Sequence, residues 1–119
     1  IVLVSASTPP FYLEYLRERN YDFIVAGDDH VDYAKALEVL YNRYNCRIIR
    51  TDSGGVLTNA LIEQGLVDEI SLVVSPCLVG TGEPHLFRSL SLPKRMPLEL
   101  ISCETLGGNH LSLIYKVLK

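Results

Sequence analysis

The sequence predicts an α/β domain in which a βαβαβα parallel part is followed by antiparallel C-terminal strands. Over residues 1–65, short apolar runs alternate with segments in which apolar residues recur at helical spacing. Such alternation is typical of right-handed crossovers and of a parallel sheet covered on both faces. From residue 68 on, the apolar segments have strand character and no helical segment separates them, which indicates antiparallel pairing.

Three strands are expected in the parallel part, over residues 1–4, 23–26 and 47–50. The first two are continuous apolar runs of the kind found in strands that are buried on both faces. The third centres on Ile48 and Ile49. The chain of 119 residues begins inside a predicted strand and without Met, so we expect a single domain whose N-terminal portion is missing.

Each of these strands is followed by a predicted helix. Pro9 and Pro10 suit the first turn of the first helix, which is expected to end at Asn20. Asp32 is a typical N-cap for the second helix, and the third is expected to end at Gly65. The second helix has the clearest amphipathic pattern, carried by Tyr33, Ala36, Leu37, Leu40 and Tyr44.

The antiparallel part is expected to contain strands over residues 68–79, 98–104 and 111–118. A connection rich in turn residues separates the first two. The sequence Leu-Gly-Gly-Asn at 106–109 is a hairpin signal and joins the last two.

The charge and hydropathy of the chain argue against two kinds of partner. The formal net charge is −3, whereas nucleic-acid binders usually carry a basic face. The apolar runs are far shorter than the roughly 18 residues that a membrane-spanning helix requires, and no secretory leader is visible. We therefore expect no nucleic acid and no membrane among the partners.

The cysteines and histidines show no pattern of a metal site or a disulfide framework. Cys46, Cys77 and Cys103 form no C-x-x-C pair, so we expect reduced, mostly buried thiols in a cytoplasmic protein. The histidines share no metal-ligand spacing, and we expect them at the surface and no metal to be bound; they are His30, His85 and His110.

Two adjacent glycines, Gly54 and Gly55, stand where the third strand is expected to end and the third helix to begin. Ligands of open parallel sheets bind beyond the carboxyl ends of the strands, and a helix N-terminus favours an anion. Side chains at these positions would hold a phosphate away from the backbone N–H groups. The corner indicates a nucleotide pyrophosphate site, and the alternative is that the glycines only form a tight turn.

The hydroxyl side chains that follow the first predicted strand allow two interpretations. Ser5, Ser7 and Thr8 could hold a 2′-phosphate, or they could form the entry to the first helix, which the residue types favour.

The chain resembles the pyrimidine reductases of riboflavin biosynthesis over essentially its whole length. The matching stretches are TDSGGVLTNALIEQGLVDE at residues 51–69, ISLVVSPCLVGTGEPHLF at 70–87 and IVAGDDHVDYAKALEVLYNRY at 24–44, with GLVDE the most specific part. The resemblance implies a dihydrofolate-reductase-like three-layer sandwich. It also implies reduction of the ribosylamino group of a pyrimidine 5′-phosphate to a ribitylamino group, with hydride from NADPH.

The resemblance also implies roles for particular residues. The glycine corner and the two residues after it should meet the cofactor phosphates through backbone N–H groups: Gly54, Gly55, Val56 and Leu57. Val31 should lie against the adenosine half of the cofactor, and Asp52 should face the substrate, with N-capping of the third helix as its rival role. Members of this fold often join the two glycines by a cis peptide, which is expected for Gly54–Gly55. No catalytic acid or base is assigned.

Two substrates fit the resemblance. The chain lacks the H-x-E and P-C-x-x-C motifs of a zinc deaminase. This favours 2,5-diamino-6-ribosylamino-4(3H)-pyrimidinone 5′-phosphate over the alternative, 5-amino-6-(5-phosphoribosylamino)uracil. A homodimer that pairs through the antiparallel tail is expected. The alternative from another class is a non-catalytic nucleotide-binding or dimerisation module of the same fold.

Overall fold

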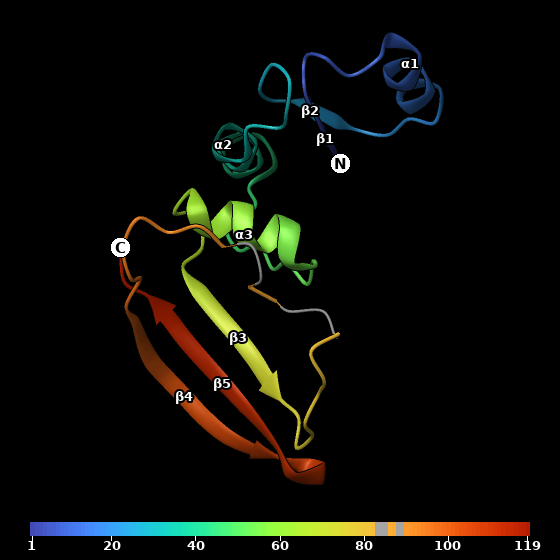
Figure 1. Ribbon diagram of the computed structural model, residues 1–119. Coiled ribbons are helices and arrows are strands. Elements are labelled where there is room, and N and C mark those ends of the chain that lie inside the picture. Colours follow the sequence, from blue (N-terminus) through green and yellow to red (C-terminus); the bar gives the residue numbers. More distant parts are fainter. Residues whose placement is uncertain (83–85, 88–89) are drawn as a thin grey trace. The chain divides into compact units, whose positions relative to one another are not determined.

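The computed structural model describes residues 1–82, 86–87 and 90–119 (Figure 1). The chain divides into two compact units, Ile1–Arg50 and Thr51–Lys119. The first unit contains a parallel strand pair and the second an antiparallel sheet, as the sequence predicts. The chain therefore has a mixed α/β architecture.

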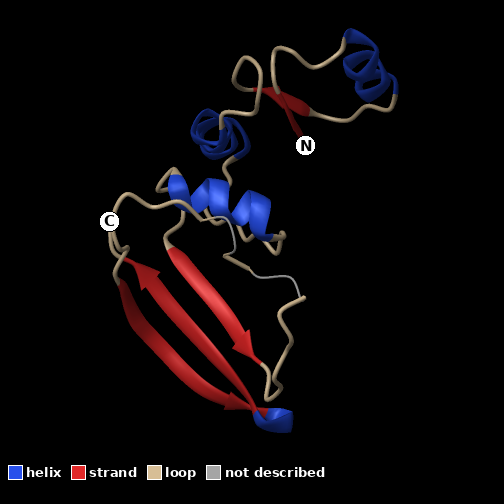
Figure 2. Cartoon of the chain, in the orientation of Figure 1, coloured by secondary structure: helices blue, strands red, loops and turns tan. Residues whose placement is uncertain are grey.

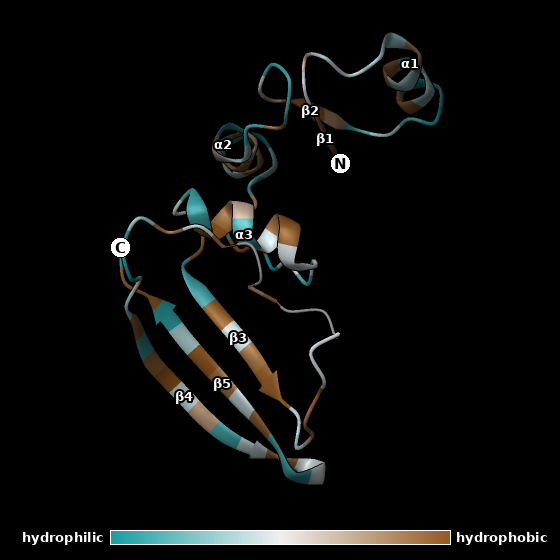
Figure 3. Cartoon of the chain, in the orientation of Figure 1, coloured by the Kyte–Doolittle hydropathy of each residue, from teal (hydrophilic) through white to brown (hydrophobic). Residues whose placement is uncertain are grey.

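The first unit alternates strands and helices (Figure 2). Its elements are β1 (Val2–Val4), α1 (Pro10–Glu18), β2 (Phe23–Val25) and α2 (Tyr33–Tyr44). The two strands are parallel, with Leu3 opposite Ile24. Both are apolar along their whole length (Figure 3), which confirms the first two predicted strands.

The core of the first unit lies between β2 and α2. Ile24, Ala26 and Ala36 are buried there. Partly buried apolar side chains pack around them, from β1, the loop after β2 and α2: Leu3, Val31, Val39, Leu40 and Tyr44. The amphipathic stripe predicted for the second helix thus supplies much of this core.

The helix ends follow the predicted capping residues. The N-terminus of α1 has Pro10 in its first turn, and Asn20 lies just beyond the helix with a φ of 55°. At α2, the carboxylate of Asp32 accepts a hydrogen bond of 3.1 Å from the backbone N–H of Lys35. Asn45 ends α2 in the left-handed conformation. The predicted N-cap is confirmed.

Acidification should weaken this cap. The hydrogen bond from the backbone N–H of Lys35 lowers the pKa of Asp32, and the exposed Lys35 ammonium, 3.3 Å from the carboxylate, adds to the effect. Because the pKa is lower in the folded state, the cap stabilises above the unfolded-state pKa, and this contribution is lost as pH falls through the folded-state pKa. In Asp32→Asn the amide caps without titrating.

The measurement is the urea midpoint of wild type and Asp32→Asn across the acid range. Any advantage of the wild type should shrink as the pH falls below about 4, the ordinary value for aspartate. A difference that stays constant with pH would show that Asp32 does not act through its charge.

The second unit combines one helix with a three-stranded antiparallel sheet. Its elements are α3 (Gly55–Glu63), β3 (Glu69–Val74), β4 (Leu98–Leu106), η1 (Gly107–Asn109) and β5 (His110–Val117). The strand order is β3-β5-β4, so β5 is central. Gly108 and Asn109 have φ values of 72° and 64°, as a tight hairpin turn requires, and Gly65 with φ 68° follows α3. The predicted hairpin and helix end are confirmed.

The predicted third strand at residues 47–50 is wrong. In the part of the chain that the structure describes, no strand forms there and none pairs with it. The side chain of Ile48 is 91% exposed and that of Ile49 is 51% exposed. An apolar run forms a strand only where a neighbouring strand bonds its backbone, and the run alone does not supply that neighbour.

Two strand lengths also differ from prediction, for the same reason. β3 ends at Val74 rather than at residue 79, because its partner β5 begins at His110 and Val74 already pairs with Leu111. β4 continues to Leu106 rather than stopping at residue 104, because Leu106 still pairs with His110 across the hairpin. Strand length is set by the partner available for pairing.

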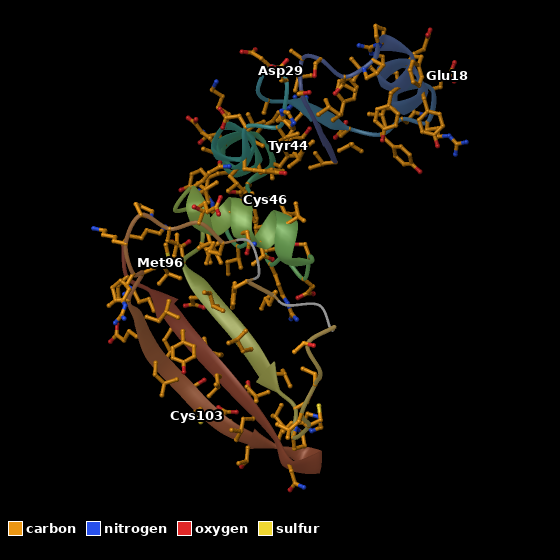
Figure 4. The ribbon with its side chains drawn as sticks, viewed as in Figure 1. Glu18, Asp29, Tyr44, Cys46, Met96 and Cys103 are labelled. Carbon is orange, nitrogen blue, oxygen red and sulfur yellow. The ribbon has the colours of Figure 1, made fainter. Side chains whose placement is uncertain are left out.

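The three cysteines are free thiols, as expected, but two of them are exposed. Cys77 follows β3, and Cys103 lies on the edge strand β4 (Figure 4). The prediction of mostly buried thiols is wrong for this pair. Among the described residues, no helix has the length and hydropathy needed to cross a membrane.

Candidate functional site

The glycine corner forms the N-terminus of α3. Gly54 is the N-cap residue, with φ −68° and ψ 175°, and α3 begins at Gly55. The first backbone bond of the helix joins the N–H of Thr58 to the carbonyl oxygen of Gly54 at 3.3 Å. Among the described residues, no side chain caps the helix. The N–H groups of the first turn therefore face outward with the positive end of the helix dipole behind them.

The chain itself gives no reason for glycine at position 54. The backbone there is extended, a conformation that any residue adopts. A Cβ built on Gly54 would meet no atom within 4 Å. Gly27 is the opposite case, because its φ of +87° and its close neighbours require glycine. The space beside Gly54 is therefore open with respect to the described residues.

The predicted cis peptide between Gly54 and Gly55 is wrong. The described residues contain no cis peptide bond. The extended backbone of Gly54 brings the chain into α3 through a trans bond.

A pocket of about 340 Å³ lies beside the corner, within the second unit. Its walls come from the corner, one side of α3, β3 and residues 86–87. The polar contributors are Thr51, Asp52, Ser53, Thr58, Glu69 and Ser71, and the apolar ones are Leu61, Ile62, Val67, Ile70, Leu72, Leu86 and Phe87. A lining that combines apolar side chains with several polar groups is typical of a small-molecule site, and the volume lies in the usual range.

Asp52 lines this pocket and is exposed. The N-cap residue of α3 is Gly54, so the rival role of Asp52 as the N-cap is wrong. It lines the pocket together with its chain neighbours Thr51 and Ser53. This is a position from which it can accept hydrogen bonds from a bound molecule.

A cluster of three hydroxyl groups, from Thr51, Ser53 and Thr58, holds the corner in place. The Oγ atoms of Thr51 and Ser53 are 2.8 Å apart, and those of Ser53 and Thr58 are 3.4 Å apart. The Thr58 hydroxyl also donates to the carbonyl oxygen of Ser53 at 3.2 Å. Sequence reasoning missed this cluster, although hydroxyl residues on both sides of a glycine pair were a signal for it.

The remaining predicted site residues differ in their surroundings. Val56 is 86% exposed in the first turn of α3, and Leu57 is half-buried. Val31 lies in the first unit and packs against its core. Asp52 lines the pocket, and Gly54–Leu57 follow it in the chain at the start of α3. The proximity of Val31 to the cofactor stays a prediction.

In the first unit, the hydroxyl residues after β1 form the entry to α1, the interpretation that their residue types favour. The backbone N–H of Ser5 donates to the Thr8 hydroxyl at 3.1 Å. The hydroxyls of Ser5 and Ser7 donate to the carbonyl oxygen of Asp29 at 3.2 and 3.0 Å. These bonds join the loop after β1 to the loop after β2.

The histidines do not gather in the part of the chain that the structure describes. His110 Nδ1 lies 3.1 Å from the carbonyl oxygen of Gly107 in the hairpin, and His30 lies in the loop after β2. No group of three metal-ligating side chains is found among the described residues. His85, expected at the surface, lies outside them.

Relatives of known name match most of the chain. A reductase of Aquifex aeolicus named 2,5-diamino-6-ribosylamino-4(3H)-pyrimidinone 5′-phosphate reductase is 31% identical over 80 residues, which are 67% of this chain and 35% of that protein. The protein of the same name from Methanothermobacter thermautotrophicus is 34% identical over 80 residues, or 67% of this chain and 36% of the relative. The matched region spans about a third of the length of these relatives.

Solved structures show the same fold. A pyrimidine reductase-like protein from Corynebacterium diphtheriae superposes with a TM-score of 0.81 at 18% identity, covering 99% of this chain and 50% of that one. RibD from Acinetobacter baumannii gives a TM-score of 0.76 at 18% identity, covering 98% of this chain and 31% of that one.

The model of one protein family matches residues 1–111, almost the whole chain, and so includes both the corner and the pocket. Together with the named relatives and the shared fold, this match shows that the chain belongs to the RibD C-terminal domain family.

Proposed function

We propose that this chain contributes to an NADPH-dependent reductase of riboflavin biosynthesis, which converts the ribosylamino group of a pyrimidine 5′-phosphate to a ribitylamino group. The preferred substrate is 2,5-diamino-6-ribosylamino-4(3H)-pyrimidinone 5′-phosphate, because the relatives from Aquifex and Methanothermobacter are named for it. Family membership supports this function. The local observation that carries it is the open, uncapped corner at Gly54 beside a pocket.

The residues of the corner fit a nicotinamide dinucleotide. A Cβ at Gly54 would stand in the open space that a phosphate needs, and the first turn of α3 offers its N–H groups there. Under this proposal Gly54, Gly55, Val56 and Leu57 hold the cofactor phosphates, and Val31 lies against the adenosine half. The bound cofactor would supply the hydride for the reduction.

The pocket would take the substrate. Its apolar lining residues suit a flat pyrimidine ring, and Asp52, which also lines the pocket, would accept hydrogen bonds from the ribose hydroxyls or ring amino groups. The role of the chain is to orient the sugar and to exclude water from it.

We further propose a dihydrofolate-reductase-like three-layer sandwich, a cytoplasmic location and a homodimer. The dimer is supported by the edge strand β4, which bears exposed apolar side chains at Leu98, Leu100 and Ile101. A sheet edge of this kind is open to pairing with a second copy. Sedimentation equilibrium of the purified protein tests this, and a monomer at all concentrations would contradict it.

The function is tested by titrating the protein, in the longest form that its gene encodes, with NADPH and with NADH. We expect binding in the micromolar range, equivalent to about −8 kcal/mol, with NADPH the tighter ligand. Adding each of the two pyrimidine substrates should then oxidise NADPH, the diaminopyrimidinone faster than the uracil. Absence of binding to both nucleotides would contradict the proposal and favour a module without this activity.

Replacement of Asp52 by asparagine should raise KM for the pyrimidine substrate roughly tenfold and leave NADPH affinity unchanged. The asparagine keeps the shape of the side chain but removes the charge, and a hydrogen bond to a charged group contributes about 1.5–3 kcal/mol. Steady-state kinetics with each ligand varied in turn measure the two constants.

Asp68→Asn is the matched control for this substitution. Asp68 is an exposed carboxylate of the same unit that pairs with Lys119 Nζ at 2.7 Å and does not line the pocket. Its replacement should leave KM unchanged. Equal effects of the two substitutions would show that Asp52 acts only through overall charge.

A further inference from the structure

The hydroxyl cluster of Thr51, Ser53 and Thr58 has one consistent arrangement of protons. The Thr58 hydroxyl donates to the carbonyl oxygen of Ser53, and the N–H of Ser53 donates to Thr51 Oγ1 at 3.4 Å. This leaves the Thr51 hydroxyl to donate to Ser53 Oγ and the Ser53 hydroxyl to donate to Thr58 Oγ1. Each hydroxyl then donates once, and the carbonyl oxygen of Ser53 has a fixed partner on α3.

Fixing this carbonyl also fixes the N–H that follows it. The Ser53 carbonyl and the Gly54 N–H belong to one planar trans peptide and point in opposite directions. Since the carbonyl oxygen points toward Thr58, the N–H of Gly54 points away from α3. Thr58 holds the corner a second time, through its backbone N–H to the Gly54 carbonyl oxygen at 3.3 Å.

We propose that Thr58 is a positioning residue for the cofactor, which acts by orienting the Gly54 N–H toward the phosphate site. This rests on the proposed function, since it assumes that a dinucleotide phosphate approaches the corner. Glycine at positions 54 and 55 makes the backbone there unusually free to rotate, so a bond that fixes the adjoining peptide plane has a larger effect than at an ordinary helix start. Because Thr58 also lines the pocket, this role is isolated by measuring NADPH affinity in the absence of the pyrimidine substrate.

The experiment compares Thr58→Val, which keeps the branched shape and lacks the hydroxyl, with Thr58→Ser, which keeps the hydroxyl. Fluorescence titration with NADPH should show about fivefold weaker binding for Thr58→Val, as expected for the loss of one partly buried hydrogen bond. Thr58→Ser should bind NADPH nearly as well as the wild type. KM for NADPH should rise in parallel for Thr58→Val and stay near the wild-type value for Thr58→Ser. Ser53→Ala, which leaves the carbonyl bond intact, should have a smaller effect.

The outcomes separate this inference from the function on which it rests. If wild type binds NADPH and Thr58→Val binds it equally well, the positioning role is wrong and the reductase function stands. If Thr58→Val only lowers the unfolding midpoint, with KM for NADPH unchanged, the role of Thr58 is structural. If wild type itself fails to bind, the proposed function and this inference are both wrong. Thr58→Ala, a better helix former, replaces Thr58→Val if that variant does not fold.

Discussion

The variant Gly54→Asp should lose at least roughly a hundredfold in NADPH affinity, or about 2.7 kcal/mol, while folding as well as the wild type. The added carboxylate would occupy the open space at the N-terminus of α3, where the proposal places the cofactor phosphates. Two like charges at short distance in a partly enclosed site repel each other strongly. The measurement is a fluorescence titration with NADPH, combined with a thermal unfolding curve.

NADPH affinity should fall while the unfolding midpoint does not, which makes this variant diagnostic. Aspartate is among the favoured N-cap residues, and position 54 has the extended backbone that an N-cap requires. The unfolding midpoint of Gly54→Asp should therefore stay level or rise, although the cofactor site is lost. A variant that loses binding because it is misfolded would instead show a lower midpoint.

Gly107→Asp is the control for added charge. Gly107 also has room for a Cβ, and it lies in the hairpin between β4 and β5, at the end of the sheet away from α3 (Figure 1). This variant should bind NADPH like the wild type. Unchanged affinity in Gly54→Asp would show that no phosphate approaches the corner and that the glycines are only a turn.

Local sequence signals predicted most of the helices and strands. The second helix was predicted from its apolar stripe and from Asp32, and the hairpin from Gly108 and Asn109. Both predictions were correct because a helix and a hairpin turn depend on residues that lie close together in the chain. Residues 47–50 and the end of β3 were predicted less well. Both depend on whether a partner strand lies alongside, and a single segment does not contain that information.

Some features of the candidate site could likewise be predicted from the sequence and others could not. The glycine corner was visible in the sequence because two glycines before a helix are rare and have few explanations. The hydrogen bonds of the hydroxyl cluster could not be predicted from the sequence. They form only because the backbone between Ser53 and Thr58 brings the Thr58 hydroxyl next to the Ser53 carbonyl oxygen. Nor could the sequence decide whether Asp52 or Gly54 caps α3, since both are acceptable N-cap residues and only the backbone angles distinguish them.

Gly27→Ala should destabilise the first unit by at least about 3 kcal/mol. The φ of +87° at Gly27 is costly for any residue with a Cβ, by about 1–2 kcal/mol. The added Cβ would also overlap the carbonyl oxygen of His30 and lie 2.8 Å from the amide nitrogen of Asp32. Both are backbone atoms, so the loop itself would have to move.

Moving the loop after β2 would break the hydrogen bonds that join it to the residues following β1. The carbonyl oxygens of Gly27 and Asp28 accept hydrogen bonds of 2.9 Å from the N–H groups of Ala6 and Ser7, and Ala26 accepts one of 3.0 Å from Asp32. The last of these holds the first turn of α2, whose Ala36 is part of the core. Urea unfolding followed by circular dichroism should show a lower midpoint for Gly27→Ala, because the first unit would unfold at a lower urea concentration than in the wild type.

Gly65→Ala separates the two causes of this destabilisation. Gly65 also has a positive φ, of +68°, but a Cβ there would meet no atom within 4 Å. The free energy of unfolding of Gly65→Ala should therefore fall only by the cost of the positive φ, about 1–2 kcal/mol. The difference between the two variants measures the cost of displacing the loop after β2. Equal destabilisation by the two substitutions would show that this loop yields without cost, and the bonds from Ala6, Ser7 and Asp32 would then contribute little to the stability of the fold.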